Sequence, residues 1–380
     1  MRKQIPLAEP YFSGRELAYV KQVFASGKID AGGEFTQATE ALLAKLIASP
    51  HVFLISSCSA ALEMAACLLN LEPGDEIIAP SFTFVTTVSS FARFGARPVF
   101  VDIRPDTCNI DERLVEAAIT PRTRAIVPVH YAGVPAELDA LRAIADKHGV
   151  LLIEDAAQAL HAKYDGRAAG TVGQLATFSF HETKNFVCGE GGALCVNDPE
   201  LVDRAYVIRD KGTNRRAFID GRVDKYTWVD MGASYVLSEI NAAVLKAQLE
   251  AVVDITRMRK ALYSNYIGAL GSLEDTGRLS LPSIPTQCTS NYHLFHFLLK
   301  EPYRQSDMLN YLRGRGIGAS FHYIPLHSAP QGRRLGGDRF ELPVTDMVSR
   351  SIVRLPLFPG MTSDEQDRVV DAVHEFFEKH

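Results

Sequence analysis

The segment Val150-Leu-Leu-Ile-Glu-Asp155 is a short, nearly continuous apolar run that ends in two acidic residues. A run of this length without polar alternation is typical of a strand buried on both faces of a sheet. Six more short apolar runs occur between residues 52 and 196. They are Val52–Ser56, Glu76–Pro80, Pro98–Asp102, Ala125–His130, Ala176–Ser179 and Gly192–Val196.

Helix-like segments separate several of these runs, namely Ala60–Leu69, Asp111–Ile119 and Glu137–His148. Strands that alternate with helices predict a mostly parallel sheet with helices on both faces, which is an α/β fold. In such a sheet, ligands bind beyond the carboxyl ends of the strands. We therefore look for chemistry in the residues that directly follow each run.

The pattern of the sequence changes after about residue 250. The later segments alternate helical and strand-like patterns, which predicts a smaller α+β domain. These segments are a long helix Ser238–Leu270, a Pro-rich turn Leu281–Pro285, a strand His293–Leu299 and helices Ser306–Arg315 and Ser363–Lys379. We expect residues 1–255 to form an N-terminal segment and a large domain, and residues 256–380 to form the small domain. The first 50 residues, with one helix from Gly14 to Ser26, are expected to pack beside the small domain.

Composition excludes several classes of protein. The 380 residues include 40 Lys and Arg against 45 Asp and Glu, for a net charge of −5, and 47% are hydrophobic. This balance argues against a nucleic-acid or membrane-surface partner. The longest stretch free of charged residues, Leu279–Leu299, is too polar and too interrupted by proline to cross a bilayer. No apolar region follows Arg2 and Lys3, so no signal peptide is predicted.

The six cysteines form no Cys-x-x-Cys pair, and no Cys and His residues have the spacing of zinc ligands. We therefore predict no metal site. Unpaired cysteines are typical of small buried side chains in a reducing compartment, which favours a cytoplasmic protein.

A second informative segment is Thr177-Phe-Ser-Phe-His-Glu-Thr-Lys184, in which an apolar run leads directly into a polar stretch with one lysine. A lysine at a strand end is most often a solvated charge. The alternative is a lysine that forms a Schiff base, because a dry position at a strand end lowers the pKa of its amine.

An acidic residue offers a matching signal. Asp155 ends an apolar strand, where a carboxylate must be paired or caps the next helix. Because Lys184 and Asp155 both follow strands of one predicted sheet, they are expected along one edge. Pyridoxal phosphate (PLP) needs such a pair, namely a lysine for its aldehyde and an acid that keeps its ring nitrogen protonated.

Two further features match the needs of this cofactor. Ser56–Met64 is a hydroxyl-rich turn that leads into a helix, and it is either a phosphate site or an ordinary serine cap. Ser179 adds a hydroxyl group near Lys184. Phe82 and Phe84 follow another strand, where either ring stacks on a cofactor or packs in the core.

Taken in chain order, these segments resemble the DegT-like sugar-nucleotide aminotransferases, which are PLP enzymes of fold type I. The resemblance covers essentially the whole chain. It is carried by Ser57–Met64, Pro80–Phe84, Val129–Gly133, Glu154–Gln158, Phe178–Asn185, Gly189–Gly192 and Phe321–His327.

The resemblance implies a role for each matching residue. Lys184 would bind the cofactor aldehyde and act in catalysis, Asp155 would face the ring nitrogen, and Gln158 would lie beside the ring hydroxyl. The remaining assignments follow the same resemblance. Phe84 would stack on the ring, Ser59, Ala60 and Ser179 would hold the phosphate, and His322 and Tyr323 would wall the sugar site.

The implied activity is the transfer of an amino group from glutamate to C4 of a dTDP-4-keto-6-deoxy-hexose. Lys211–Arg215 and Asp224–Asp230 are most similar to the branch that makes dTDP-4-amino-4,6-dideoxy-galactose for surface polysaccharide of the enterobacterial common antigen type. The implied assembly is a cytoplasmic homodimer with shared active sites. Three alternatives remain: transfer to another 4-keto or 3-keto NDP-sugar, including formation of the gluco epimer, sugar dehydration, and a non-catalytic sugar-nucleotide-binding regulator. Relatives that dehydrate sugars have histidine in place of Lys184, which argues against dehydration.

A basic stretch, Lys211–Lys225, carries Arg222 among glycines. It is either a solvated loop or a flap over the nucleotide diphosphate, because guanidinium matches phosphate geometry. In the second case Arg222 binds substrate.

Many relatives have Gly-Tyr-Asn-Tyr-Arg where this chain reads Gly232-Ala-Ser-Tyr-Val236. The family asparagine reaches the neighbouring subunit's phosphate, and Ser234 is shorter.

Overall fold

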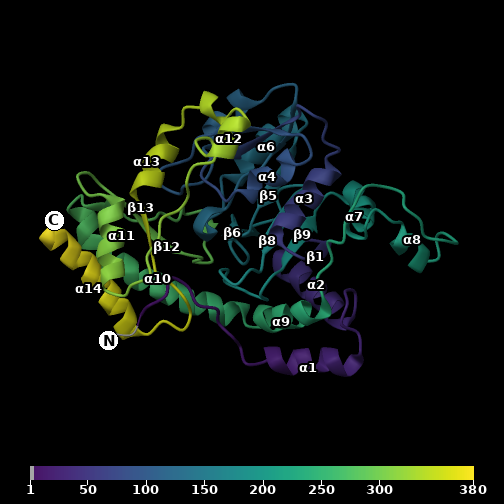
Figure 1. Ribbon diagram of the computed structural model, residues 1–380, viewed down its shortest axis with the longest axis horizontal. Helices are drawn as coiled ribbons and strands as arrows, with labels where there is room; N and C mark the ends of the chain where they lie inside the picture. The colour runs from purple at the N-terminus through teal and green to yellow at the C-terminus, as the bar shows by residue number, and fades with distance from the viewer. Residues whose placement is uncertain (1–3) are drawn as a thin grey trace.

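The computed structural model describes residues 4–380, so Arg2 and Lys3, which entered the signal-peptide prediction, lie outside the described residues. A seven-stranded sheet in the order β1-β9-β8-β5-β4-β2-β3 forms the centre of the larger domain (Figure 1). Its strands are β1 (Val52–Ile55), β2 (Glu76–Pro80), β3 (Arg97–Val101), β4 (Thr123–Ile126), β5 (Leu151–Asp155), β8 (Leu175–Ser179) and β9 (Gly192–Val196). β9 is antiparallel to β1 and β8, and the other pairs are parallel. The predicted α/β fold with a mostly parallel sheet is confirmed.

Helices cover both faces of this sheet. α3 (Cys58–Leu68), α4 (Thr86–Ala92) and α7 (Val202–Arg209) pack on one face. α2 (Glu34–Ile47), α6 (Leu138–His148) and α9 (Glu239–Glu250) pack on the other. In β1, Phe53 and Ile55 join the first core, and Val52 and Leu54 join the second. Burial on both faces explains why these strands are continuously apolar rather than alternating.

The smaller C-terminal domain is α+β, as predicted, and it lies on the left in Figure 1. Its sheet is antiparallel, in the order β10-β12-β13. Its elements are β10 (Leu279–Ser280), β12 (Phe295–Leu299), β13 (Ile352–Leu355), α10 (Val252–Asp275), α11 (Gln305–Gly314), α13 (Pro343–Ser351) and α14 (Ser363–Lys379). The predicted helix over residues 363–379 is confirmed.

The remaining helices and strands lie outside the two main sheets and the helices that cover them. They are α1 (Glu16–Ser26), α5 (Glu112–Val115), η1 (Glu116–Ala118), η2 (Tyr131–Gly133), β6 (Lys163–Tyr164), β7 (Arg167–Ala168), η3 (Pro199–Leu201), α8 (Arg215–Ile219), β11 (Cys288–Thr289), α12 (Pro330–Arg334) and η4 (Gly337–Arg339). Within residues 4–380, no helix is both long and apolar enough to cross a membrane. In the same range, no group of three or more His, Cys, Asp or Glu side chains is placed to hold a metal ion.

The prediction for the first 50 residues is confirmed in one part and wrong in another. The segment around Ile5 packs on the small domain, where it pairs with Ile317 and joins the core. The rest contains a second helix, α2, and both α1 and α2 pack against α9 of the large domain. The buried Glu239 at the start of α9 explains this arrangement, because its carboxylate accepts the N–H groups of Gly33, Phe35 and Thr36 at 2.8–3.0 Å. Glu239 caps α2 from a position about 200 residues farther along the chain. The sequence around α2 therefore does not predict where this helix begins.

The long helix predicted over residues 238–270 is divided at Ala251 into α9 and α10. The break has a tertiary cause, because α9 packs on the large sheet and α10 on the core of the small domain. The predicted domain boundary at residue 255 falls inside α10, and it stays a prediction.

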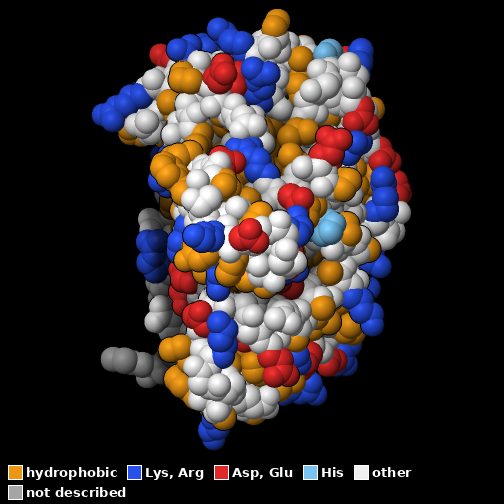
Figure 2. Space-filling view, turned by 90° about the vertical axis from the view of Figure 1, so that its right-hand side faces the viewer, with side chains coloured by type: hydrophobic (Ala, Val, Ile, Leu, Met, Phe, Trp, Pro, Cys, Tyr) orange, Lys and Arg blue, Asp and Glu red, His pale blue; other side chains and the backbone are white. Residues whose placement is uncertain are grey.

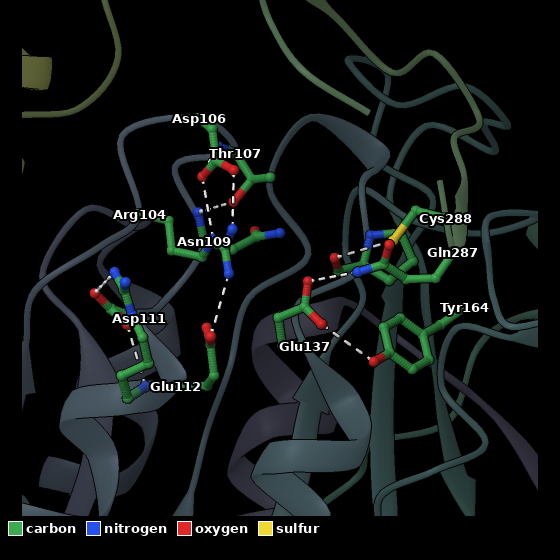
Figure 3. A network of polar contacts seen from close by, with 12 residues as sticks. Arg104, Asp106, Thr107, Asn109, Asp111, Glu112, Glu137, Tyr164, Gln287 and Cys288 are labelled. Carbon is green, nitrogen blue, oxygen red and sulfur yellow. Dashed lines mark hydrogen bonds and ion pairs between the residues drawn. The ribbon is translucent and has the colours of Figure 1, made fainter. Parts of the chain in front are cut away.

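The chain beyond α10 first returns to the large domain before it enters the small sheet. β11 pairs with β6, and Gln287 Nε2 donates to Glu137 Oε1 at 2.8 Å. Tyr164 donates to the other oxygen of Glu137, at 3.2 Å (Figure 3). These contacts hold the segment that leads into the small sheet against the large domain.

Candidate active site

Asp155 is the last residue of β5, at the carboxyl end of the sheet, and only 4% of it is exposed. Its Oδ2 accepts a hydrogen bond from Thr87 Oγ1 at 2.7 Å, and its Oδ1 accepts one from the N–H of Ala157 at 3.2 Å. Within residues 4–380 no lysine or arginine forms an ion pair with it. The carboxylate is therefore held in place by neutral donors.

Lys184 lies in the loop that follows β8, the strand next to β5. Its backbone N–H donates to the carbonyl of His181 at 2.9 Å, and its side chain is half-buried. Burial lowers the pKa of Lys184 and outweighs the opposing effect of the nearby charge of Asp155. No carboxylate of the described chain forms an ion pair with Lys184. A lysine with a lowered pKa and no ion-pair partner is suited to act as a nucleophile.

The first turn of α3 lies beside both of these groups. Ser57 caps the helix, since its Oγ accepts the N–H of Ala60 at 3.1 Å. Burial, together with the charge of Asp155, raises the pKa of the Cys58 thiol to about 12. A Cβ on Gly192 would lie 2.4 Å from the backbone nitrogen of Cys58, so only glycine lets β9 approach this turn. The turn therefore presents a helix N-terminus, with Ser59 and Ala60, next to Asp155 and Lys184.

Gln158 and Tyr323 join the two domains at this edge. Gln158 Oε1 accepts the N–H of Ala132 at 2.8 Å, and its Nε2 donates to the Tyr323 hydroxyl at 3.1 Å. The ring of Tyr323 stacks on His322, with centroids 3.8 Å apart and planes 17° apart. These contacts place Tyr323 and His322 of the small domain over the large sheet.

His322 is hydrogen-bonded through both ring nitrogens. Nε2 lies 2.8 Å from Arg354 Nη1, and Nδ1 lies 3.2 Å from the Tyr131 hydroxyl. Because a guanidinium only donates, Nε2 accepts and the ring is neutral. Burial and the charges of Arg354 and Lys184 lower the pKa of His322 to about 2. Through Tyr323 and Gln158, His322 is connected to the carboxyl edge of the large sheet.

Two phenylalanines were candidates for stacking on a ring, and the structure separates them. Phe82 is 1% exposed and packs edge-on against Tyr131 and Tyr323, with centroids 5.3 and 5.5 Å apart. Phe84 is 57% exposed and lies in the turn before α4. α4 is the helix that contains Thr87, whose hydroxyl donates to Asp155. Phe84 therefore offers a free ring at the site, and Phe82 is part of its aromatic wall.

Ser179 ends β8 five residues before Lys184 and is half-buried. Among the residues that the structure describes, its Oγ accepts only a long contact of 3.5 Å, from the N–H of His181. This hydroxyl is thus available on the same side of the sheet as the first turn of α3.

Arg222 lies away from these residues in the structure (Figure 1). It follows α8 on an arm, residues 211–234, which projects at the far right of Figure 1. Its guanidinium lies 3.3 Å from Asp220 and 3.9 Å from Asp203. Ser234, at the base of the arm, is exposed and pairs with Asp210.

Three side chains of the site were not singled out from the sequence: Thr87, Tyr131 and Arg354. Arg354 could have been recognised as a candidate site residue, because it is the only charged residue of the strand Ile352-Val-Arg-Leu355. A cation inside a buried strand needs a partner, which is a reason to look for a ligand. Thr87 and Tyr131 could not have been recognised in the same way, since their contacts form only in the folded chain.

The residues present fit PLP. A half-buried lysine without an ion-pair partner suits its aldehyde, a buried carboxylate suits its ring nitrogen, and a helix N-terminus with hydroxyl groups suits its phosphate. Together with the mostly parallel sheet and the smaller C-terminal domain, this site defines a PLP-dependent enzyme of fold type I.

Comparison with known proteins gives the family. Residues 10–374 match the DegT/DnrJ/EryC1/StrS aminotransferase family. The chain is 30% identical to the aminotransferase TlmJ from Streptoalloteichus hindustanus, with a TM-score of 0.92 over 99% of this chain and 100% of that one. It is 33% identical to DesV from S. venezuelae, with a TM-score of 0.88 over 98% of each chain. The chain belongs to the DegT/DnrJ/EryC1/StrS aminotransferase family.

The cofactor agrees with this assignment. Spr1654 from Streptococcus pneumoniae, solved in PLP and PMP forms, is 26% identical, with a TM-score of 0.91 over 99% of each chain. The protein is a PLP-dependent sugar aminotransferase. The predictions of family, fold type, enzyme class and cofactor are confirmed.

Proposed function

We propose that this sugar aminotransferase moves an amino group from glutamate to C4 of dTDP-4-keto-6-deoxy-hexose. The product is dTDP-4-amino-4,6-dideoxy-galactose, an amino sugar for surface polysaccharide of the enterobacterial common antigen type. The observation that supports the proposal is the contact between the domains beside these residues: Gln158, which follows β5 and Asp155, donates to Tyr323 of the small domain, and Tyr323 stacks on His322. Lys184 follows β8, the strand that pairs with β5.

PLP, when bound, supplies an aldehyde that exchanges amino groups and a ring that accepts electrons. Lys184 Nζ would hold the aldehyde, take a proton from the α-carbon of glutamate, and later give one to C4 of the sugar. Asp155 would keep a proton on the ring nitrogen, and Thr87 holds its carboxylate in position.

Other residues would position the reactants. Gln158 would contact the ring hydroxyl, and the exposed ring of Phe84 would stack on the cofactor. Ser59, Ala60 and Ser179 would bind the phosphate at the N-terminus of α3. His322 and Tyr323, whose rings are stacked, would form one wall of the sugar site and exclude water from it.

The choice of sugar rests on the arm. Its segments Lys211–Arg215 and Asp224–Asp230 resemble the 4-aminogalactose branch, and the fold brings them together. Thr213 and Trp228 form a β-bridge, and Asn214 Oδ1 accepts the N–H of Thr227 at 2.7 Å.

We propose a homodimer with shared active sites. The arm exposes large apolar side chains, among them Ile219, Tyr226, Trp228 and Met231, of which Trp228 is 72% exposed. Figure 2 shows hydrophobic side chains among Lys and Arg side chains on the side from which the arm projects. A second copy of the chain would bury these side chains and would bring Arg222 and Ser234 toward a neighbouring pocket.

The proposal places the enzyme in the cytoplasm. All six cysteines are free, and four of them are buried, as expected in a reducing compartment.

Incubation with glutamate and candidate 4-keto sugar nucleotides, followed by NMR of the product, tests the function. The proposal predicts an axial amine at C4, the galacto configuration, with 2-oxoglutarate as the second product. An equatorial amine would instead assign the gluco epimer. Turnover only with a 3-keto sugar would assign that substrate, and sugar-nucleotide binding without turnover would indicate a regulator.

A further inference from the structure

Lys184 lies in a loop that is tied to a distant segment of the chain through the side chain of the next residue. The loop, residues 181–187, is neither helix nor strand, so its side chains decide where it lies. His181 and Thr183 contact each other within the loop, at 3.0 Å. Asn185 is buried and instead contacts a segment that begins 106 residues farther along the chain.

Both ends of the Asn185 amide are hydrogen-bonded to this segment. Nδ2 donates to the backbone carbonyl of Asn291 at 2.9 Å, and Oδ1 lies 2.9 Å from His293 Nδ1. Because a carbonyl only accepts, Nδ2 must face Asn291, and Oδ1 accepts the proton of His293 Nδ1. His293 is buried, and burial together with the charge of Lys184 lowers its pKa well below the ordinary value. The ring is therefore neutral and donates only through Nδ1.

The segment that receives Asn185, residues 291–293, is itself held from two sides. Asn291 Nδ2 donates to the carbonyl of Gln158 in the large domain at 2.8 Å. From the small domain, Arg259 of α10 donates through Nε to the carbonyl of Tyr292 at 2.9 Å. Since both domains hold this segment, it offers a fixed support for the loop that carries the lysine.

We propose that Asn185 and His293 are positioning residues for Lys184, and that the hydrogen bond between them holds the loop where the lysine amine meets the cofactor aldehyde. Neither residue would itself touch substrate or cofactor. The inference rests on the role proposed for Lys184, and it is independent of the amino donor and of the sugar.

The chemistry of this contact suits a lysine that must react as a free amine. A carboxylate next to Lys184 would favour the protonated form and raise the pKa of the amine. An amide and a neutral imidazole hold the loop without adding a charge. Precise placement matters for the bond itself, because a small displacement of a reacting group causes a large loss of reactivity.

The test compares the binding of PLP with that of pyridoxamine phosphate (PMP), which has no aldehyde and forms no bond with a lysine. Both are titrated into the full-length chain after removal of the cofactor. In His293→Gln the amide nitrogen lies near the position of Nε2, so the bond to Asn185 is lost. The Kd of PLP should rise by about tenfold, because the lysine is held less precisely. The Kd of PMP should be unchanged.

Three further variants complete the experiment. His293→Asn places its amide nitrogen near the position of Nδ1, keeps the bond, and should restore the wild-type Kd of PLP. Asn185→Ala removes the acceptor and should raise the Kd of PLP as much as His293→Gln does, which provides the test if that variant fails to fold. His161→Gln is the matched control, because it removes another contact between the large domain and α10, from His161 Nδ1 to Thr256 at 3.0 Å. It should change neither Kd.

The outcomes separate this inference from the role of Lys184. An unchanged Kd of PLP in His293→Gln and Asn185→Ala overturns the inference. An equal rise for PLP and PMP overturns it as well, since the contact would then support the whole pocket, and so does a rise in His293→Asn equal to that in His293→Gln. Lys184→Ala removes the bond to the aldehyde. An unchanged Kd of PLP in that variant would refute the role of Lys184, and the inference with it.

Discussion

The carboxyl edge of the large sheet and the arm differ in how far their side chains are buried and in what those side chains contact. At the edge, Asp155 is 4% exposed and both of its oxygens accept hydrogen bonds. On the arm, Trp228 is 72% exposed, and the guanidinium of Arg222 forms ion pairs with the nearby acids Asp220 and Asp203. Fixed groups with matched partners are suited to chemistry, because they need no rearrangement during the reaction. The arm, in contrast, exposes large apolar side chains, which in the proposed homodimer would be covered by a second copy of the chain.

The largest loss of turnover is expected for Lys184→Ala, at the edge of the large sheet. Loss of the amine removes both the nucleophile and the proton carrier, so turnover should fall by about 1,000-fold or more. Borohydride reduction followed by mass spectrometry should show no cofactor attached to the variant. Lys163→Ala, at an exposed position on β6, is the control and should retain both properties. Near-normal turnover by the Lys184 variant would remove this lysine from the mechanism.

A smaller loss is expected for Asp155→Asn. The amide has the shape of the carboxylate and can still accept the hydrogen bond from Thr87, so the fold should survive. It cannot hold a proton on the ring nitrogen by its charge, and turnover should fall by about 100-fold or more. Steady-state kinetics, with Asp254→Asn on the surface as a control, measures the effect. Equal rates for the two variants would contradict the role assigned to Asp155.

The contrast between the two regions also explains how far the sequence could be read. Asp155 ends a buried strand and Lys184 follows the neighbouring one, and a strand's apolar run is a local signal, so their position along one edge of the sheet could be predicted. The partnership of Arg354 with His322 joins β13 to a loop and depends on tertiary packing. The cap that Glu239 provides for α2 is equally invisible in local sequence. In the proposed homodimer, the position of Arg222 relative to substrate would depend on a second chain, which the sequence of one chain does not describe.

For the arm, we predict first an effect on assembly. Trp228→Ala removes a large exposed ring from the surface that a second copy would cover. Truncation of such an anchor should raise the dimer dissociation constant by about 30-fold. Sedimentation velocity over a range of protein concentrations measures it. Leu114→Ala, an exposed apolar residue on α5, serves as the control, and equal dissociation constants would show that the arm is not at the interface.

The smallest effect is expected for Arg222→Ala. If its guanidinium binds the nucleotide diphosphate from an exposed loop, the KM for the sugar nucleotide should rise by about tenfold. The KM for glutamate should be unchanged, because the donor carries no diphosphate. Arg257→Ala, an exposed arginine on α10, is the control for the loss of a surface charge. Equal effects on both KM values would count against a flap over the nucleotide.

Mixed dimers would show which site the arm serves. A dimer of one Lys184→Ala chain and one Arg222→Ala chain has a single working lysine, in the chain whose arm is altered. If the arm reaches the neighbouring site, that lysine is covered by the intact arm of its partner, and the KM for the sugar nucleotide should return to the wild-type value. If the arm folds over its own site, the KM should stay raised. A raised value would leave the arm in its own chain and would refute the shared active site.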